Sequence, residues 1–181
     1  MLSQDQKDIL LKTAKQAIES VLCKRSSEEN LCDDEQLKEK CGCFVTLKNA
    51  GQLRGCIGMF VSDKPLIETV SEMAIAATKD GRFFDNPVTA DELDQLDIEI
   101  SVLSPLKKTD DPLSLRLGVD GIYIKNGYAS GCFLPQVATE TGWTKEEFLS
   151  QCCQGKANLS ADAWKDADTD VYLFSAEIIG E

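Results

Sequence analysis

The residues best suited to chemistry lie in one hexapeptide, Leu53-Arg54-Gly55-Cys56-Ile57-Gly58, inside an apolar segment typical of a β-strand. The alternation of a strand would place Arg54 and Cys56 on one face, where the arginine would favour the nucleophilic thiolate. Glycines inside a strand often mark the close approach of a ligand, and their N–H groups can stabilise an oxyanion. The hexapeptide is therefore a candidate site, with Cys56 as nucleophile or covalent carrier, Arg54 as anion anchor or thiolate stabiliser, and Gly55 and Gly58 beside the ligand.

A second segment, residues 97–102, alternates apolar and polar side chains, which is typical of a half-buried strand. If this strand belongs to the sheet of the hexapeptide, Glu99 and Ser101 can share the face of Arg54 and Cys56. Glu99 is then a candidate acid/base or arginine partner, and Ser101 is a candidate ligand-binding residue. Two polar side chains of the neighbouring strand are expected to join them: Thr46 and Lys48.

Arg82 and Phe83 are further candidate ligand-binding residues, and both they and the hexapeptide have an alternative interpretation. Arg82 and Phe83 belong to a predicted loop that could line a ligand pocket, but aromatic side chains in such loops also enter the core. The hexapeptide has a structural interpretation as well, in which Arg54 pairs with Glu99 and Cys56 fills a gap too small for a larger side chain.

Histidine is absent from all 181 residues, which excludes Ser-His and Cys-His dyads, a histidine base and imidazole metal sites. The eight cysteines form no C-x-x-C pair, so most are expected to be small buried residues rather than zinc ligands. A metal ion bound by carboxylates alone stays an open alternative. No nucleotide-binding glycine motif is present, and the sequence names no cofactor.

The net charge of −12, from 19 basic and 31 acidic residues, disfavours binding to nucleic acid and to anionic membranes. No apolar segment reaches membrane-spanning length, and the polar residues 1–6 lack the apolar centre of a signal peptide. We therefore expect a cytoplasmic protein with reduced cysteines that binds neither nucleic acid nor membrane.

The predicted elements follow the order helix, hairpin, helix, strand, hairpin, short helices, strand. The first helix begins with a capping box at Ser3, and the second hairpin turns at Asn126-Gly127. Asp63 is expected to cap the helix after the first hairpin, and residues 24–40 are expected to form a surface connection with a helical turn around residues 35–39. Because hairpins pair antiparallel, the sequence predicts an α+β fold with an antiparallel sheet flanked by helices.

Six segments of the sequence together resemble the AMMECR domain family, whose stand-alone prokaryotic members are called AmmeMemoRadiSam system protein A. The segments are, in order, GCFVTL (42–47), LRGCIG (53–58), IEISVLSP (98–105), LPQVA (134–138), GWTKEEFL (142–149) and FSAE (174–177). The resemblance covers nearly the whole chain, and LRGCIG is its most specific part. Where the family usually has Asp-Pro-Arg-Phe, this chain has Asp80-Gly81-Arg82-Phe83, and glycine makes that loop more flexible.

The resemblance implies a single domain over residues 1–181 with two lobes, the larger with an antiparallel sheet and the smaller mainly helical. It places the hexapeptide near a cleft between the lobes. It also implies a Memo-type protein and a radical SAM protein as partners, but it does not imply a particular reaction.

Two functions follow as hypotheses. The first is binding of a small molecule or a modified peptide in a cleft lined by the hexapeptide, with catalysis by Cys56 as a further step. The alternative is a non-catalytic module that docks on a partner such as a Memo-type protein, with the hexapeptide serving the fold.

Overall fold

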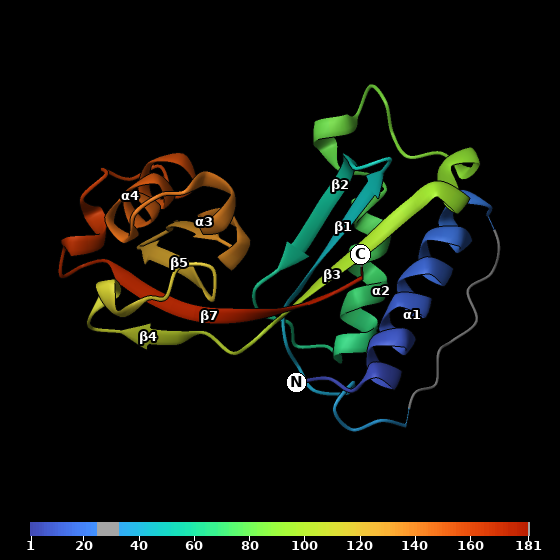
Figure 1. The fold of residues 1–181 in the computed structure, drawn as a ribbon, viewed down its shortest axis with the longest axis horizontal. Helices are drawn as coiled ribbons and strands as arrows, with labels where there is room; N and C mark the ends of the chain where they lie inside the picture. The colour runs from blue at the N-terminus through green and yellow to red at the C-terminus, as the bar shows by residue number, and fades with distance from the viewer. Residues whose placement is uncertain (25–32, 181) are drawn as a thin grey trace. The chain divides into compact units, whose positions relative to one another are not determined.

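The computed structural model describes residues 1–24 and 33–180, and the chain divides into two compact units (Figure 1). The first unit holds Met1–Leu103 together with the chain from Glu177 onward, and the second holds Ser104–Ala176. The second unit is therefore inserted, along the sequence, between two parts of the first. Among the described residues, no helix is both long and apolar enough to cross a membrane.

The sheet of the first unit is built on the predicted hairpin, β1 (Cys43–Asn49) and β2 (Gln52–Met59). The predicted strand at 97–102 is β3 (Leu96–Leu103), which pairs antiparallel with β1 on the side away from β2. The last residues of β7 (Asp170–Ile179) lie beyond β3, so β2 is the outer strand of this sheet. The prediction of an α+β fold with an antiparallel sheet is confirmed.

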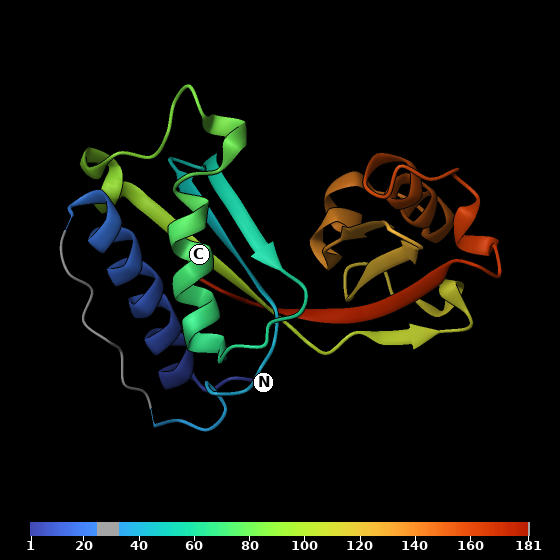
Figure 2. The same ribbon diagram turned by 180° about the vertical axis from the view of Figure 1, so that it is seen from behind.

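Helices α1 (Gln4–Leu22) and α2 (Leu66–Ala77) cover one face of this sheet, as the two opposite views in Figures 1 and 2 show. The capping box predicted at Ser3 is present, with Gln6 as its second member. The predicted cap Asp63 is wrong, because α2 begins after Pro65 and has no side-chain cap. The start of α2 is instead fastened by a buried 2.7 Å hydrogen bond between the hydroxyls of Ser62 and Thr69.

The connection between α1 and β1 is less superficial than its polar sequence suggests. Residues 25–32, which include Cys32, lie outside the described part of the chain. Leu37, in the turn that follows, is fully buried in the core of the first unit. The prediction of a surface connection is therefore wrong at Leu37, which lies in a turn at the position where the sequence predicted a helical turn.

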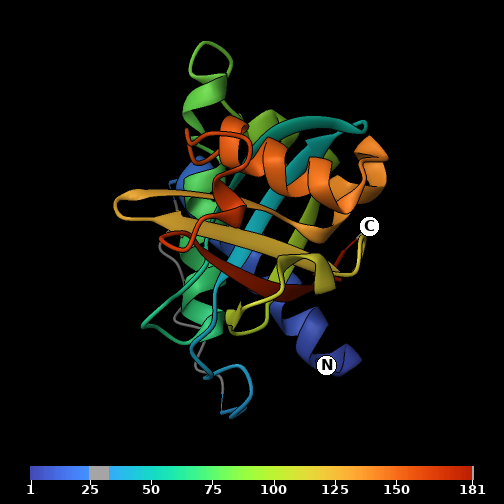
Figure 3. The same ribbon diagram turned by 90° about the vertical axis from the view of Figure 1, so that its left-hand side faces the viewer.

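The second unit, expected to be mainly helical, carries a sheet as well as helices (Figure 3). The predicted hairpin at Asn126-Gly127 joins two of its strands, and β7 pairs with both β4 and β5. Its elements are β4 (Lys107–Thr109), β5 (Asp120–Asn126), β6 (Ala129–Phe133), α3 (Pro135–Thr141) and α4 (Lys145–Gly155). Short 3-10 helices complete the fold: η1 (Gly81–Phe83), η2 (Ala90–Gln95), η3 (Pro112–Ser114) and η4 (Ala163–Lys165).

Candidate functional site

The strand register places one thiol, one hydroxyl and one carboxylate in a row across the first unit's sheet. Thr46 of β1 lies opposite Cys56 of β2 on one side and opposite Glu99 of β3 on the other. Paired residues of neighbouring strands share a face, so these three side chains lie on the face opposite α1 and α2. We call this the polar face. The prediction that Cys56, Thr46 and Glu99 share a face is therefore confirmed.

The sulfur of Cys56 has a specific partner on the polar face. The Thr46 hydroxyl donates a hydrogen bond to it, with 3.2 Å between Oγ1 and Sγ. The residue is half-buried, so the thiol is neither enclosed in the core nor fully exposed. A hydroxyl that donates to sulfur stabilises a thiolate more than a thiol.

The backbone of Cys56 is held on its open side by the loop that follows α2. Its N–H donates to the Asp80 carboxylate at 2.9 Å, and its carbonyl accepts from Nη2 of Arg82 at 3.2 Å. Because β2 is the outer strand among the described residues, these groups have no described strand beside them to pair with. The loop therefore takes the place of another strand at Cys56.

Asp80 and Arg82 form a compact ion pair at this edge. Asp80 is 5% exposed, and its carboxylate accepts from Nη2 of Arg82 at 2.6 Å and from the Arg82 backbone N–H at 3.0 Å. Hydrogen bonds from Arg82 and from the Cys56 N–H hold the pKa of Asp80 well below its usual range. The pKa of Arg82 is raised, chiefly by its hydrogen bonds to Asp80 and to a smaller extent by the Cys56 side chain. Arg82 is thus a cation within electrostatic reach of the sulfur, while its guanidinium lies 5.8 Å from the Phe83 ring.

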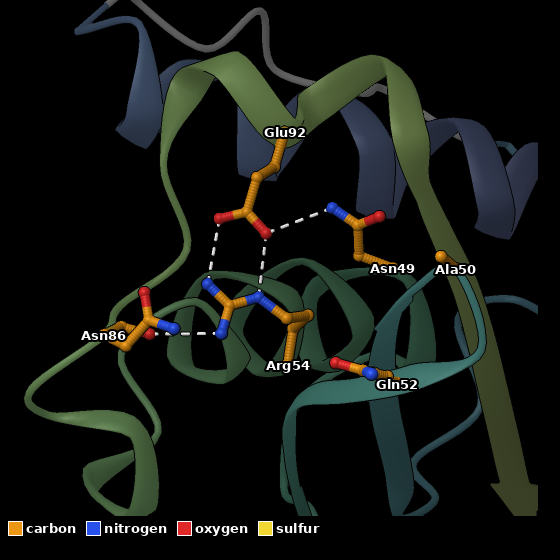
Figure 4. Close-up of a pocket in the computed structure, with 6 residues that line it drawn as sticks. All are labelled: Asn49, Ala50, Gln52, Arg54, Asn86 and Glu92. Carbon is orange, nitrogen blue, oxygen red and sulfur yellow. Dashed lines mark hydrogen bonds and ion pairs between the residues drawn. The ribbon is translucent and has the colours of Figure 1, made fainter.

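Arg54, the predicted activator, is engaged elsewhere (Figure 4). Its Nε and Nη2 donate to the two oxygens of Glu92 at 2.8 and 2.9 Å, and it also donates to the backbone carbonyls of Asn86 and Pro87, each at 3.2 Å. The pair is largely buried, since the side chains of Arg54 and Glu92 are 11% and 20% exposed. These bonds lower the pKa of Glu92 to about 2. The predicted pairing of Arg54 with Glu99 is wrong, because Glu99 pairs instead with Lys48 at 3.0 Å.

The space beside the glycines of the hexapeptide is filled by neighbouring residues of the protein and is not open to a ligand. A Cβ atom on Gly55 would lie 2.1 Å from the Ala77 carbonyl oxygen, so Gly55 allows α2 to approach β2. A Cβ atom on Gly58 would lie 2.3 Å from the Phe44 ring. Ser101 shares the polar face but is only 2% exposed, so it does not reach solvent in this structure. The structure thus corrects the expectation that the two glycines and Ser101 open onto a ligand.

A hollow of about 360 Å³ lies beside this site, between the β1–β2 turn and the loop before β3 (Figure 4). It is lined by Asn49, Ala50, Gln52, Arg54, Asn86 and Glu92. Arg54 is the one hexapeptide residue in this lining, and Cys56, Glu99 and Ser101 lie outside it. The predicted residues are therefore divided between the hollow and the polar face.

Within residues 1–24 and 33–180, no three or more cysteine or carboxylate side chains come together in a way that could hold a metal ion. Several other cysteines are buried in the cores of the two units. Burial raises the pKa of Cys43 to about 12 and that of Cys132 to about 11, and it also raises the pKa of Cys152. These thiols are held in the protonated form, which is a poor nucleophile.

The chain is similar to known proteins along nearly its whole length. A family model described as AMMECR1 matches residues 11–179. A protein from Methanothermobacter thermautotrophicus is 46% identical over an alignment 189 residues long, which covers 99% of this chain and 96% of that protein. Protein TK0174 of Thermococcus kodakarensis is 42% identical and covers 96% of this chain. The crystal structure of the uncharacterized protein PH0010 from Pyrococcus horikoshii matches with a TM-score of 0.88 and 39% identity, over 98% of this chain and 92% of that one.

Proposed function

The chain belongs to the AMMECR1 family, and we propose that it binds a small molecule or a modified peptide at the β2 edge of the polar face, where Cys56 is the reacting group. The proposal rests on two groups that lie close to the Cys56 sulfur. The sulfur accepts a hydrogen bond from Thr46 and lies within the electrostatic reach of Arg82. In this proposal residues 1–181 act as one domain with two lobes.

The roles of the hexapeptide residues follow from their contacts. Cys56 attacks an electrophilic carbon of the ligand, and Thr46 and Arg82 stabilise the thiolate. The new bond joins sulfur to that carbon, the bond from the carbon to the leaving group breaks, and the thiol proton passes through solvent to the leaving group. Arg54 acts through the loop, because its bonds to Glu92, Asn86 and Pro87 hold in place the segment that also carries Arg82.

Alkylation of the folded protein tests the proposal. We expect limiting iodoacetamide at about pH 8 to modify Cys56 ahead of Cys43, Cys132 and Cys152, because burial raises the pKa of those three thiols. Peptide mapping by mass spectrometry reads the site, and Cys56→Ser should remove the fast phase of the reaction. The matched control is Cys23→Ser, which changes another half-buried cysteine, at the C-terminal cap of α1 and outside the site. Modification spread evenly over all the cysteines would contradict a reactive Cys56.

A second candidate function, docking on a partner protein, is favoured by one observation. Phe84 is 83% exposed in the loop that Arg54 and Arg82 fasten to β2. An exposed aromatic side chain on an anchored loop is a typical contact residue of an interface. In this alternative the partner is a Memo-type or radical SAM protein, and the hexapeptide serves to hold the loop.

The two candidates are separated by a binding assay with a purified Memo-type protein. Docking predicts that Phe84→Ser weakens binding, whereas Tyr128→Ser, at another fully exposed aromatic residue, leaves it unchanged. Docking also predicts that a folded Cys56→Ala protein still binds. Absence of binding by the unaltered protein would remove this alternative.

A further inference from the structure

We infer that the second unit binds a phosphate group of a small molecule in a hollow between β4, the start of β5 and β7. The hollow has a volume of about 410 Å³, which lies within the range of small-molecule sites. It is lined by Ser104, Lys107, Lys108, Thr109, Ser114, Arg116, Asp120, Leu173, Phe174 and Ser175. It belongs entirely to residues 104–176 and shares no residue with the site at Cys56, so this inference is independent of the proposed function.

The hollow carries more positive than negative charge, although the chain as a whole is acidic. The whole protein has a net charge of −12, yet the lining holds three cations, Lys107, Lys108 and Arg116, against Asp120 in the lining and Asp170, which pairs with Lys108. In an acidic protein, such a local excess of positive charge attracts a small anion to this place.

Arg116 is held in position for binding by its neighbour. Its backbone N–H and its Nε donate to one oxygen of Asp120 at 2.8 and 2.9 Å, and Nη2 donates to the other at 2.9 Å. The hydrogen bonds from Arg116 also lower the pKa of Asp120, which keeps that carboxylate charged and the pair intact. Nη1 has no partner among the described residues, so one edge of a fixed guanidinium remains available to an anion.

Two further donors complete the set. Lys107 lies opposite Leu173 in the β4–β7 pairing, and among the described residues its ammonium has neither an ion pair nor a hydrogen bond. Lys108 differs, because its ammonium pairs with Asp170 at 2.6 Å. The hydroxyl of Ser175 likewise has no partner in the part of the chain that the structure describes. Its backbone is fixed, since its N–H donates to the Ser104 hydroxyl at 2.9 Å and its carbonyl accepts from the Ser104 N–H.

The three donors match the chemistry of a phosphate group better than that of a carboxylate. An ammonium, a guanidinium edge and a hydroxyl from three different segments can each bind one of the three terminal oxygens of a phosphate monoester. Leu173 adds an apolar residue to the lining, which would suit an apolar body carried by the phosphate. The ligand class is therefore a phosphate ester of a small molecule or free phosphate.

Calorimetric titration of the full chain with inorganic phosphate and with phenyl phosphate tests the inference. We expect saturable binding, and we expect Lys107→Gln to weaken it by about tenfold, as loss of one charge-assisted hydrogen bond does. Arg116→Gln should weaken it as well. The matched control is Lys125→Gln, which removes the same charge from an exposed lysine on β5 outside the hollow.

The two phosphates distinguish the two sources of the group. Tighter binding of phenyl phosphate supports a phosphate ester whose body contacts Leu173, and equal binding supports free phosphate. Two results would overturn the inference. One is an absence of saturation with both compounds, and the other is an equal loss of affinity in Lys107→Gln and Lys125→Gln. Thermal unfolding of each variant verifies that it is folded.

Discussion

The Asp80 carboxylate accepts the backbone N–H of Cys56 at 2.9 Å, which joins the loop after α2 to the outer strand β2. Arg82 completes the clamp from the other side by donating to the Cys56 carbonyl. The residue that carries the thiol is thus fixed through its backbone, and its side chain remains free to face Thr46. Rigid support of this kind is what a reactive group requires.

Replacement of Arg82 tests whether this clamp also promotes the thiolate. Arg82→Gln should slow alkylation of Cys56, because the variant loses the cation that donates a hydrogen bond to the carbonyl of the same cysteine. Arg82→Lys keeps the charge and should recover most of the rate. The measurement is the rate of iodoacetamide incorporation into the peptide that contains Cys56. Equal rates in all three proteins would show that Arg82 serves only the loop.

Arg54 should be critical for stability. Arg54→Lys cannot bind both oxygens of Glu92, so we expect the free energy of unfolding to fall by about 1–2 kcal/mol. The comparison is Arg116→Lys, whose arginine also pairs with a carboxylate but is 70% exposed and should lose less. Urea unfolding should be followed by far-UV circular dichroism. Tryptophan fluorescence would report on the second unit alone, because both tryptophans lie there.

The stability of the first unit should fall in acid. The folded-state pKa of Glu92, about 2, is below its ordinary value of 4.5. The ionised form therefore stabilises the fold fully above about pH 4.5, and that contribution is lost as the pH falls toward 2. Urea unfolding midpoints across this range should fall less steeply for Glu92→Gln than for the unaltered protein. Asp94→Asn, at an exposed carboxylate of the same short helix, is the matched control for the loss of one negative charge.

Gly55 should not tolerate a side chain. Gly55→Ala brings a methyl group against the Ala77 carbonyl, so α2 or β2 must shift, at a cost of about 1–3 kcal/mol. Gly81→Ala is the matched control, because no described atom beyond the adjacent residues lies within 4 Å of the added methyl group. Equal unfolding free energies in the two variants would contradict the close approach of α2 at Gly55.

Gly81 offers the opposite test, a gain in stability. It is the first residue of η1, a position that suits proline, and its backbone N–H makes no hydrogen bond to another described backbone group. Gly81→Pro should raise the free energy of unfolding by about 0.5–1 kcal/mol, because the unfolded chain loses freedom. A lower urea midpoint would show that the loop needs the glycine.

The fold was largely predictable, because its signals are local. The capping box at Ser3, the Asn126-Gly127 turn and the alternation of 97–102 each depend on a few neighbouring residues, and each predicted its element correctly. The shared face of Cys56 and Glu99 followed from alternation as well.

The partners in the site were less predictable, because they depend on an irregularity in the strand. Between Gly55 and Leu53 the register of β2 shifts relative to β1, and Arg54 is the residue without a partner. Such a bulge breaks the strict alternation that placed Arg54 beside Cys56 and directs its side chain to Glu92 instead. One sequence signal for Glu92 did exist, since Thr89 and Glu92 have the spacing of a capping box. No comparable signal singles out Asp80, whose carboxylate accepts a hydrogen bond from the backbone N–H of Cys56, 24 residues earlier in the chain.

The insertion of the second unit has a consequence for how the protein is made. The ribosome completes residues 104–176 before it adds Glu177, whose carboxylate binds the Leu2 N–H at 3.0 Å and the Lys7 ammonium at 3.0 Å. The first unit therefore lacks part of its structure during synthesis, although most of its residues emerge first. The second unit can reach its native contacts on the nascent chain, whereas the unit that carries Cys56 is completed only after Glu177 and the residues that follow it have been added.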